Sequence, residues 1–306
     1  MDSDKNKLFC VLLDLIKEFD RVCNENKIQY YAFAGTLLGA IRHKGFIPWD
    51  DDVDFLVPRK DYNRLKDLAK KGVFRYPFFF QNVETDKGFS KGFSRLMNEN
   101  TTGLIYVELS SKCKKGIFID IYPIDNIPDS KIDYFIQRRL VLFFVMLLHA
   151  YSRYYSGFLV NRLPFKKKLL LYSLYPLFML NILSSKRIFY LIEMIASRYR
   201  DKNSKRVGIF CFFGNNSRLI YNREWVDEIV YAPFETIKIP IPREYDSILK
   251  KTYGDYMTPV KNASCHQGYF YSAEIGYRDY MDYNKDTVDN FFNQIIAKGH
   301  ENKQQE

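Results

Sequence analysis

The sequence predicts a mixed α/β (α+β) fold, in which a mixed sheet carries flanking helices and a helical insertion. Short aromatic and apolar runs with strand character alternate with segments of helical periodicity. Four aspartates occupy five consecutive positions directly before one of the strand-like runs. The chain has 306 residues, of which 47% are hydrophobic, so it is long enough to bury a substantial core.

The first 130 residues are expected to form a catalytic core built from short elements. Apolar residues at helical spacing, from Leu8 to Val22, predict an amphipathic helix at the start of the chain. A helix that begins at Arg59 is expected to stop at Gly72, because glycine commonly ends helices. The expected strands lie around residues 30–34, 50–57, 77–82, 89–97, 103–108 and 116–122.

Residues 131–204 are expected to form a basic, apolar helical insertion. Between residues 131 and 206 the chain has 15 Lys or Arg and 3 Asp or Glu, whereas the net charge of the whole chain is +10. The apolar blocks 140–148 and 169–183 are shorter than the ~20 residues of a transmembrane helix.

Residues 205–300 are expected to complete the catalytic domain. A helix is predicted near 242–253, where Pro240 and Pro242 precede it, and a terminal helix is predicted near 286–298. Residues 301–306 are expected to be a polar tail.

The motif W-D-D-D-V-D-F at 49–55 is the strongest chemical signal in the chain. In an extended strand, alternate side chains share a face, so Asp50, Asp52 and Asp54 are expected to stand together, with Asp51 on the other side. Three carboxylates this close repel one another unless they share a cation. An oxygen-only ligand set favours a hard ion, Mg²⁺ or Mn²⁺.

Two other interpretations of this motif remain. An EF-hand loop needs Gly at its sixth position and Glu at its twelfth, whereas Phe55 and Asp61 stand there. A solvated acidic turn is the second alternative. The upstream sequence favours a metal site, because a strand that turns through Gly35-Thr36 into a helix at 37–42 offers backbone N–H groups and a hydroxyl to a phosphate.

A second acidic element lies in the predicted strand 118–122. Alternation places Asp120 on the face opposite its two isoleucine neighbours. A single carboxylate in an apolar strand is costly unless it is paired or bound to a metal. The alternative is a carboxylate that caps a turn, a role that Asp125 fits better.

The stretch G-T-L-L-G-A-I-R-H-K-G-F-I-P-W-D-D-D-V-D, from Gly35 to Asp54, resembles the signature of the LicD family. That family belongs to the nucleotidyltransferase-fold superfamily, together with fukutin and the fukutin-related protein. Further similarity lies at 116–125 and at 239–257, so the resemblance covers roughly residues 8–125 and 205–270. The middle of the chain resembles the family poorly.

The resemblance implies a metal-dependent enzyme that moves a phosphorylated alcohol, typically phosphocholine, from CDP-choline or a similar CDP-activated donor. The implied acceptor is a sugar hydroxyl of a glycan or lipid-linked glycan precursor, such as those of lipopolysaccharide, teichoic acid or capsule. The alternatives are a nucleotidyltransferase, a ribitol phosphate or glycerol phosphate transferase, and an inactive membrane-surface scaffold.

The implied site is built from two sets of residues. Asp50, Asp52, Asp54 and Asp120 are the expected metal ligands, and Asp52, Asp54 and Asp120 are the expected catalytic residues, with Asp120 either a ligand or the base. The expected nucleotide- or phosphate-binding residues are Gly35, Thr36, Arg42, Arg95 and His266. A surface salt bridge is the alternative for Arg95, and a buried, hydrogen-bonded histidine is the alternative for His266.

The remaining composition bears on location and partners. Five cysteines without a CxxC pair and a polar N-terminus indicate a reduced, cytoplasmic protein without a zinc site. The basic insertion is expected either to lie on the inner face of the membrane through Lys166, Lys167 and Lys168, or to be a cap with a solvated basic face. No nucleic-acid-binding motif accompanies the charge, so nucleic acid is not an expected partner. Some of the 24 tyrosines and 26 phenylalanines are candidates for a quaternary ammonium cage, but the sequence singles out none.

Overall fold

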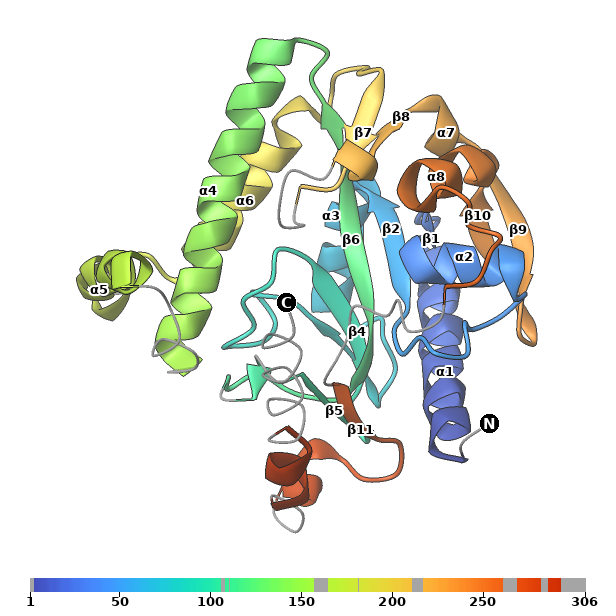
Figure 1. Cartoon of the computed structure of the whole chain (residues 1–306), viewed down its shortest axis with the longest axis horizontal. Coiled ribbons are helices and arrows are strands. Elements are labelled where there is room, and N and C mark those ends of the chain that lie inside the picture. The colour runs from blue at the N-terminus through green and yellow to red at the C-terminus, as the bar shows by residue number, and fades with distance from the viewer. Residues whose placement is uncertain are drawn as a thin grey trace.

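The computed structural model describes residues 3–105, 108–109, 111–156, 165–180, 182–210, 217–260, 269–281 and 286–292. A mixed sheet lies at the centre, with α1 along one side and the α4–α6 helices along the other (Figure 1). The predicted mixed α/β fold is therefore confirmed. None of the described helices is both long enough and apolar enough to cross a membrane.

The labelled helices are α1 (Ser3–Glu25), α2 (Ala34–Arg42), α3 (Arg59–Lys70), α4 (Lys131–Ser156), α5 (Phe165–Met179), α6 (Ser185–Ala196), α7 (Glu224–Asp227) and α8 (Tyr245–Tyr253), with 3₁₀ turns η3 (Ser197–Tyr199) and η4 (Ser217–Leu219). The strands are β1 (Tyr31–Ala32), β2 (Asp54–Pro58), β3 (Phe78–Gln81), β4 (Ser94–Asn98), β5 (Thr102–Ile105), β6 (Ile117–Ile127), β7 (Arg206–Gly208), β8 (Ile220–Asn222), β9 (Ile229–Phe234), β10 (Ile237–Pro242) and β11 (Tyr269–Ser272). Residues 277–281 and 286–292 are also helical.

The central sheet has the strand order β1-β2-β6-β4-β3. The pair β2–β6 is parallel, and the other pairs along this path are antiparallel. The 11-residue strand β6 also pairs with β7 near its end, and β7 pairs with β8. One long strand therefore connects the N-terminal half of the chain to the segment that follows the insertion.

Most of the predicted elements are present, with shifted ends. The N-terminal amphipathic helix is α1, which buries Leu8, Phe19 and other apolar residues in the main core. Helix α3 ends at Lys70, and Gly72 follows with a left-handed φ of +76°. The strand predicted at 89–97 forms only from residue 94, and the strand predicted at 30–34 is two residues long. The predicted terminal helix near 286–298 is helical as far as 292, and its remainder lies outside the described residues.

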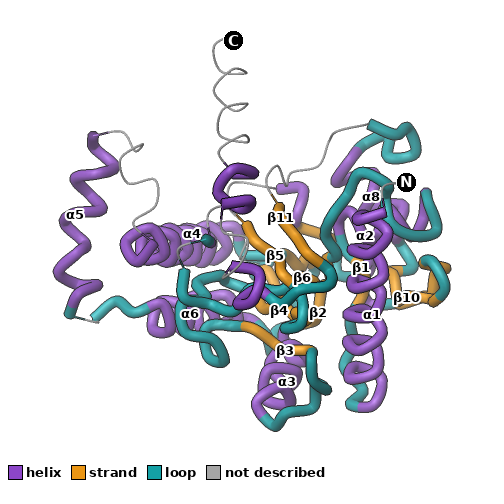
Figure 2. The backbone as a smooth tube through the Cα atoms, turned by 90° about the horizontal axis from the view of Figure 1, so that it is seen from below, coloured by secondary structure: helices purple, strands orange, loops and turns teal. Residues whose placement is uncertain are grey.

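In the segment predicted as a helical insertion, the described residues form α4, α5 and α6, followed by η3. Helices α4 and α6 form a small core of their own, in which Val141 and Val145 pack with Ile188 and Ile192. Helix α6 lies between α4 and the sheet in Figure 1, and α5 lies beyond α4, away from the sheet, in both views (Figures 1 and 2). The segment thus packs on the central domain through α6.

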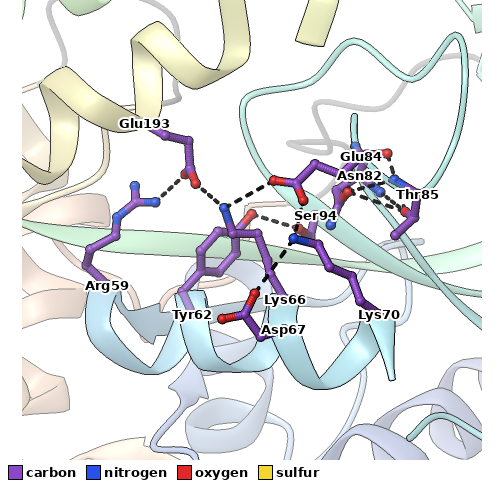
Figure 3. Close-up of polar contacts among 10 residues, drawn as sticks. All are labelled: Arg59, Tyr62, Lys66, Asp67, Lys70, Asn82, Glu84, Thr85, Ser94 and Glu193. Carbon is purple, nitrogen blue, oxygen red and sulfur yellow. Dashed lines mark hydrogen bonds and ion pairs between the residues drawn. The ribbon is translucent and has the colours of Figure 1, made fainter. Parts of the chain in front are cut away.

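Buried ion pairs attach α6 to the central domain (Figure 3). Arg59, at the start of α3, donates to both carboxylate oxygens of Asp125 at 2.6 and 2.8 Å and also to Glu193 of α6. Lys66, about two turns further along α3, donates to the other oxygen of Glu193. Burial lowers the pKa of Arg59, but the charges of Asp125 and Glu193 raise it well above its usual value, so the guanidinium stays charged.

We expect Glu193→Gln to destabilise the protein by about 1–3 kcal/mol, because it leaves two buried cations with one fewer carboxylate. Urea unfolding at neutral pH measures this. The matched control is Glu228→Gln, which removes an exposed partner of Arg243 and should change stability by less than about 1 kcal/mol. Equal losses in the two variants would show that the pairs with Glu193 contribute no more than a surface ion pair.

Candidate active site

The acidic motif lies in the loop that enters β2, and only its last aspartate is part of the strand. The backbone N–H of Asp50 donates to the carbonyl of Ile47 at 2.9 Å, which closes a turn directly before the motif. Residues 50–53 are irregular, and β2 begins at Asp54. The predicted alternation of side chains over residues 50–54 is therefore wrong, because strand periodicity does not apply to a chain that is leaving a turn.

The turn changes which carboxylates come together. One oxygen atom from each of Asp50, Asp51 and Asp52 lies within 4.8 Å of the others. Asp51, which alternation placed on the opposite side, belongs to this group. We refer to Asp50, Asp51 and Asp52 as the acidic cluster.

The other two predicted ligands stand beside each other in the sheet. Asp54 of β2 is the register partner of Asp120 of β6, and Asp120 is the register partner of Arg95 of β4. Neighbouring strands lie about 4.8 Å apart, and register partners project from the same face of the sheet. The three side chains, all buried, form a charged row across three strands, at the place where the acidic cluster enters β2.

Arg95 holds Asp120 in place. Its Nε donates to Asp120 Oδ1 at 2.8 Å, and its Nη1 donates to Glu108 Oε2 at 2.8 Å. The guanidinium carbon lies 3.8 Å from the ring centre of Phe118, a cation–π contact. The hydroxyl of Tyr122 donates to the other oxygen of Asp120 at 3.0 Å. The salt bridge considered for Arg95 thus exists, but it is buried rather than on the surface, and its contact with phosphate stays a prediction.

Arg95 and Glu108 shift each other's pKa. Burial lowers the pKa of Arg95, but Glu108 and Asp120 raise it above its usual value. Burial raises the pKa of Glu108, but the charges and hydrogen bonds of Arg95 and Lys91 lower it to about 2. Arg95 and Glu108 are therefore both charged at neutral pH.

The N-terminus of α2 lies against the acidic cluster. Gly35 and Thr36 are in the first turn of α2, and not in a separate turn before it as predicted. A Cβ atom at Gly35 would lie 2.3 Å from Oδ2 of Asp50, so only glycine lets this carboxylate approach the helix. The hydroxyl of Thr36 accepts a hydrogen bond from the backbone N–H of Asp54 at 2.9 Å. Helix α2 is thus tied to both ends of the acidic motif.

This contact has an electrostatic consequence. The first N–H groups of a helix have no acceptor within the helix, and they carry partial positive charge. Ala34, directly before Gly35, has a left-handed φ of +46°, a conformation that non-glycine residues rarely adopt and that is often found at functional sites. The helix N-terminus therefore offers donors to an anion close to a group of carboxylates.

The other predicted binding residues lie elsewhere. Arg42, at the far end of α2, donates to the backbone carbonyl of Tyr256 at 2.7 Å, and burial lowers its pKa. It joins α2 to the segment that follows α8, and its contact with substrate stays a prediction. His266 lies outside the described residues.

Two tyrosines not predicted for the site interact with its carboxylates. Burial raises the pKa of Tyr253, at the end of α8, and the negative charges of Asp54, Asp50 and Asp52 raise it further. Burial also raises the pKa of Tyr269 in β11, and so do Asp51 and Asp120, while Arg95 opposes the shift.

The chain contains 24 tyrosines, so the presence of a tyrosine does not indicate a functional site. The sequence alone therefore did not predict that Tyr253 and Tyr269 belong to this site. Tyr122 was more accessible to prediction, because it stands two positions after Asp120 in the same strand and therefore on the same face.

The carboxylates fit a divalent cation by their chemistry and spacing. Mg²⁺ binds oxygens at about 2.0–2.1 Å, so its ligand atoms lie no more than about 4.2 Å from one another. Oxygens of the acidic cluster already lie within 4.8 Å, and small side-chain rotations close the difference. An all-oxygen set also matches the ligands that Mg²⁺ and Mn²⁺ prefer.

The α+β fold and the clustered carboxylates are consistent with a nucleotidyltransferase-like domain. Residues 27–141 match the family model described as "LicD/FKTN/FKRP, nucleotidyltransferase domain". The chain is 28% identical over 252 residues to the lipopolysaccharide cholinephosphotransferase LicD of Haemophilus influenzae, a match that covers 81% of this chain and 89% of that protein. The resemblance to the LicD family is thereby confirmed, and residues 27–141 are similar to that family's nucleotidyltransferase domain.

Shorter matches connect the chain to two proteins without an assigned activity. The uncharacterized protein RP689 of Rickettsia prowazekii is 40% identical over 57 residues, or 19% of this chain and 21% of that protein. The uncharacterized protein RT0683 of Rickettsia typhi is 44% identical over 50 residues, or 16% of each chain.

We expect Gly35→Ala to weaken the binding of a divalent cation by roughly tenfold or more, because the added methyl group pushes the Asp50 carboxylate out of the acidic cluster. Titration of Mn²⁺, followed by electron paramagnetic resonance, measures this without any substrate. Gly276→Ala is the control, since its added Cβ comes no closer than 3.4 Å to another atom. Unchanged Mn²⁺ affinity in Gly35→Ala would contradict a site at the acidic cluster.

Stability should depend on pH through Glu108. Its pKa is about 2 in the folded chain and about 4.3 in an unfolded one, so its contribution is complete above about pH 4.3 and is lost as pH falls toward 2. We expect wild type to lose roughly 2–3 kcal/mol more than Glu108→Gln over this interval. Chemical unfolding at a series of pH values tests this, with Glu228→Gln as the exposed control, and equal pH slopes for wild type and Glu108→Gln would contradict it.

Proposed function

We propose that this chain transfers phosphocholine from CDP-choline to a sugar hydroxyl of a lipid-linked, cell-surface glycan precursor. The observation that carries the proposal is the acidic cluster at the N-terminus of α2, in a chain that matches a lipopolysaccharide cholinephosphotransferase over most of both lengths. Phosphate transfer needs positive charge around the phosphates and a fixed position for the attacking oxygen. The site offers residues for both tasks.

The acidic cluster and Asp54 are the residues that would hold Mg²⁺ or Mn²⁺. When bound, the ion would neutralise charge on the pyrophosphate of the donor. The first-turn N–H groups of α2, at Gly35 and Thr36, carry partial positive charge next to the acidic cluster, and they bind phosphate oxygens of the donor. Because Gly35 has no side chain, a phosphate can come as near to this backbone as the Asp50 carboxylate does.

Asp120 acts as the base toward the acceptor. Arg95 and Tyr122 each hold one of its oxygens, so the carboxylate has a fixed orientation next to Asp54. The acceptor hydroxyl attacks the phosphorus that bears choline and gives its proton to Asp120. The bond from that phosphorus to the bridging oxygen breaks, and CMP leaves.

The protein is proposed to work in the cytoplasm, at the inner face of the membrane. Lipid-linked glycan precursors present their sugars at a membrane surface, so an enzyme that modifies them gains from binding that surface. The sequence-based interpretation gave this role to Lys166, Lys167 and Lys168, whose side chains lie outside the described residues.

We expect the purified protein to release CMP from CDP-choline in the presence of lipopolysaccharide and Mg²⁺ or Mn²⁺. Asp52→Asn should lower turnover by at least about 100-fold, because it removes a charge from the metal-binding group. Asp201→Asn, at an exposed aspartate outside the site, should keep full turnover. Chromatography of the nucleotide products measures CMP, and circular dichroism checks that both variants are folded.

Three outcomes would contradict the proposal. They are full turnover by Asp52→Asn, unchanged turnover after EDTA treatment, and release of pyrophosphate from a nucleoside triphosphate in place of CMP from CDP-choline. The last result would identify a nucleotidyltransferase, and a preference for CDP-ribitol or CDP-glycerol would change the transferred group.

A further inference from the structure

The outward face of α4 is mostly apolar. From Ile132 to Met146, all described, the exposed side chains fall on one arc of about 160° at 100° per residue. The large apolar members, with their exposed fractions, are Ile132 (73%), Phe135 (58%), Ile136 (47%), Leu140 (41%), Phe143 (54%) and Met146 (60%). Arg139, and Asp133 at one edge, are the polar residues within this arc, which we call the α4 face.

The α4 face cannot turn inward. On the opposite side of the helix, Val141, Val145 and Leu148 are buried against α6. The amide of Gln137 donates at 3.0 Å to the carbonyls of Ile195 and Ala196, near the C-terminal end of α6. These contacts fix the rotation of α4, so its second apolar face stays on the outside.

An apolar outer face is unusual for a surface helix. Such helices normally place polar residues opposite the buried stripe. Exposed apolar groups of this extent mark a binding surface. Residues 132 to 146 span about 21 Å of helix, at about 1.5 Å per residue.

The net charge of the segment that contains the α4 face indicates what binds there. The exposed basic residues described between 131 and 206 are Lys131, Arg139, Lys186, Arg187, Arg198, Arg200, Lys202 and Lys205. The exposed acidic residues described in the same range are Asp133 and Asp201. Glu193 does not offset this charge, because it pairs with Arg59 and Lys66 of the central domain.

We propose that the α4 face docks on an anionic lipid surface, with α4 lying in the plane of the interface. An amphipathic helix with apolar residues on one side and basic residues around them binds such a surface. Anionic headgroups attract the basic residues, and the acyl region accepts Phe135, Phe143 and their neighbours. Arg139 can keep its charge at headgroup level while its carbon stem lies on the apolar surface. Its guanidinium carbon lies 5.1 Å from the centre of the Phe135 ring.

A second copy of the chain fits this face less well. In a two-fold contact the same face meets itself, so Arg139, near the middle of the face, and the positively charged segment would approach their own copies. Like charges facing each other oppose such a contact, whereas they complement anionic lipid. Charge complementarity therefore favours lipid over self-association.

The test is flotation of the full chain with vesicles. We expect binding to vesicles of phosphatidylglycerol mixed with phosphatidylethanolamine, weaker binding at high salt, and little binding to phosphatidylcholine alone. The variant Phe135→Gln/Phe143→Gln should bind at least about tenfold more weakly, because both rings enter the lipid. Tyr231→Gln, at an aromatic residue of β9 that is 58% exposed, should bind like wild type.

Three results would overturn the docking surface. They are no binding to the anionic vesicles, equal binding by the double variant and wild type, and a dimer in sedimentation that the double variant loses. All variants change exposed side chains, and circular dichroism confirms their fold. The docking surface depends on the proposed function only for the choice of lipid surface, and flotation is independent of turnover, so CMP release with detergent-dispersed lipopolysaccharide reports separately on the reaction.

Discussion

The parallel pairing of β2 with β6 is the contact on which the rest of the site depends. It brings Asp54 beside Asp120, although 66 positions separate them in the chain. A shift of one residue in this pairing would turn one of the two carboxylates to the other face of the sheet. The same strand β6 sets the register of β4, and so it also places Arg95. A single strand thus positions the carboxylate, the cation that orients it and the neighbouring aspartate.

The negative charges of the site have different positive neighbours. Asp120 and Glu108 share the buried guanidinium of Arg95. In the half-buried acidic cluster, Asp50 lies against Gly35 at the positive end of α2. Arg95 therefore compensates the charge of Asp120, and we propose that the acidic cluster shares a cation with a substrate.

The sequence predicted the fold class and the location of the site, because both follow from local patterns. Periodicity identified α1, and the density of aspartates identified the motif before β2. What it did not predict depends on contacts between distant segments. The turn from Ile47 to Asp50 replaces strand alternation by a cluster that includes Asp51. The partners of Arg95 follow from the register of β4 on β6, which no local pattern specifies. Likewise, the apolar block in α4 was visible in the sequence, but which of its two faces is covered depends on where α6 packs.

The ion pairs between α3 and α6 are better explained by orientation than by stability. Moving Arg59, Lys66 and Glu193 out of water opposes folding, and apolar side chains of similar volume often stabilise a core as well as a buried ion pair does. Buried charged groups require specific partners, because a shift of α6 would leave a buried charge without its counter-ion. The position of Arg59 is fixed from a second side, since it also donates to Asp125, near the end of the strand that contains Asp120. The same set of ion pairs therefore connects the strand of the candidate base to the helix on which α4 packs, so the α4 face and the site share one framework.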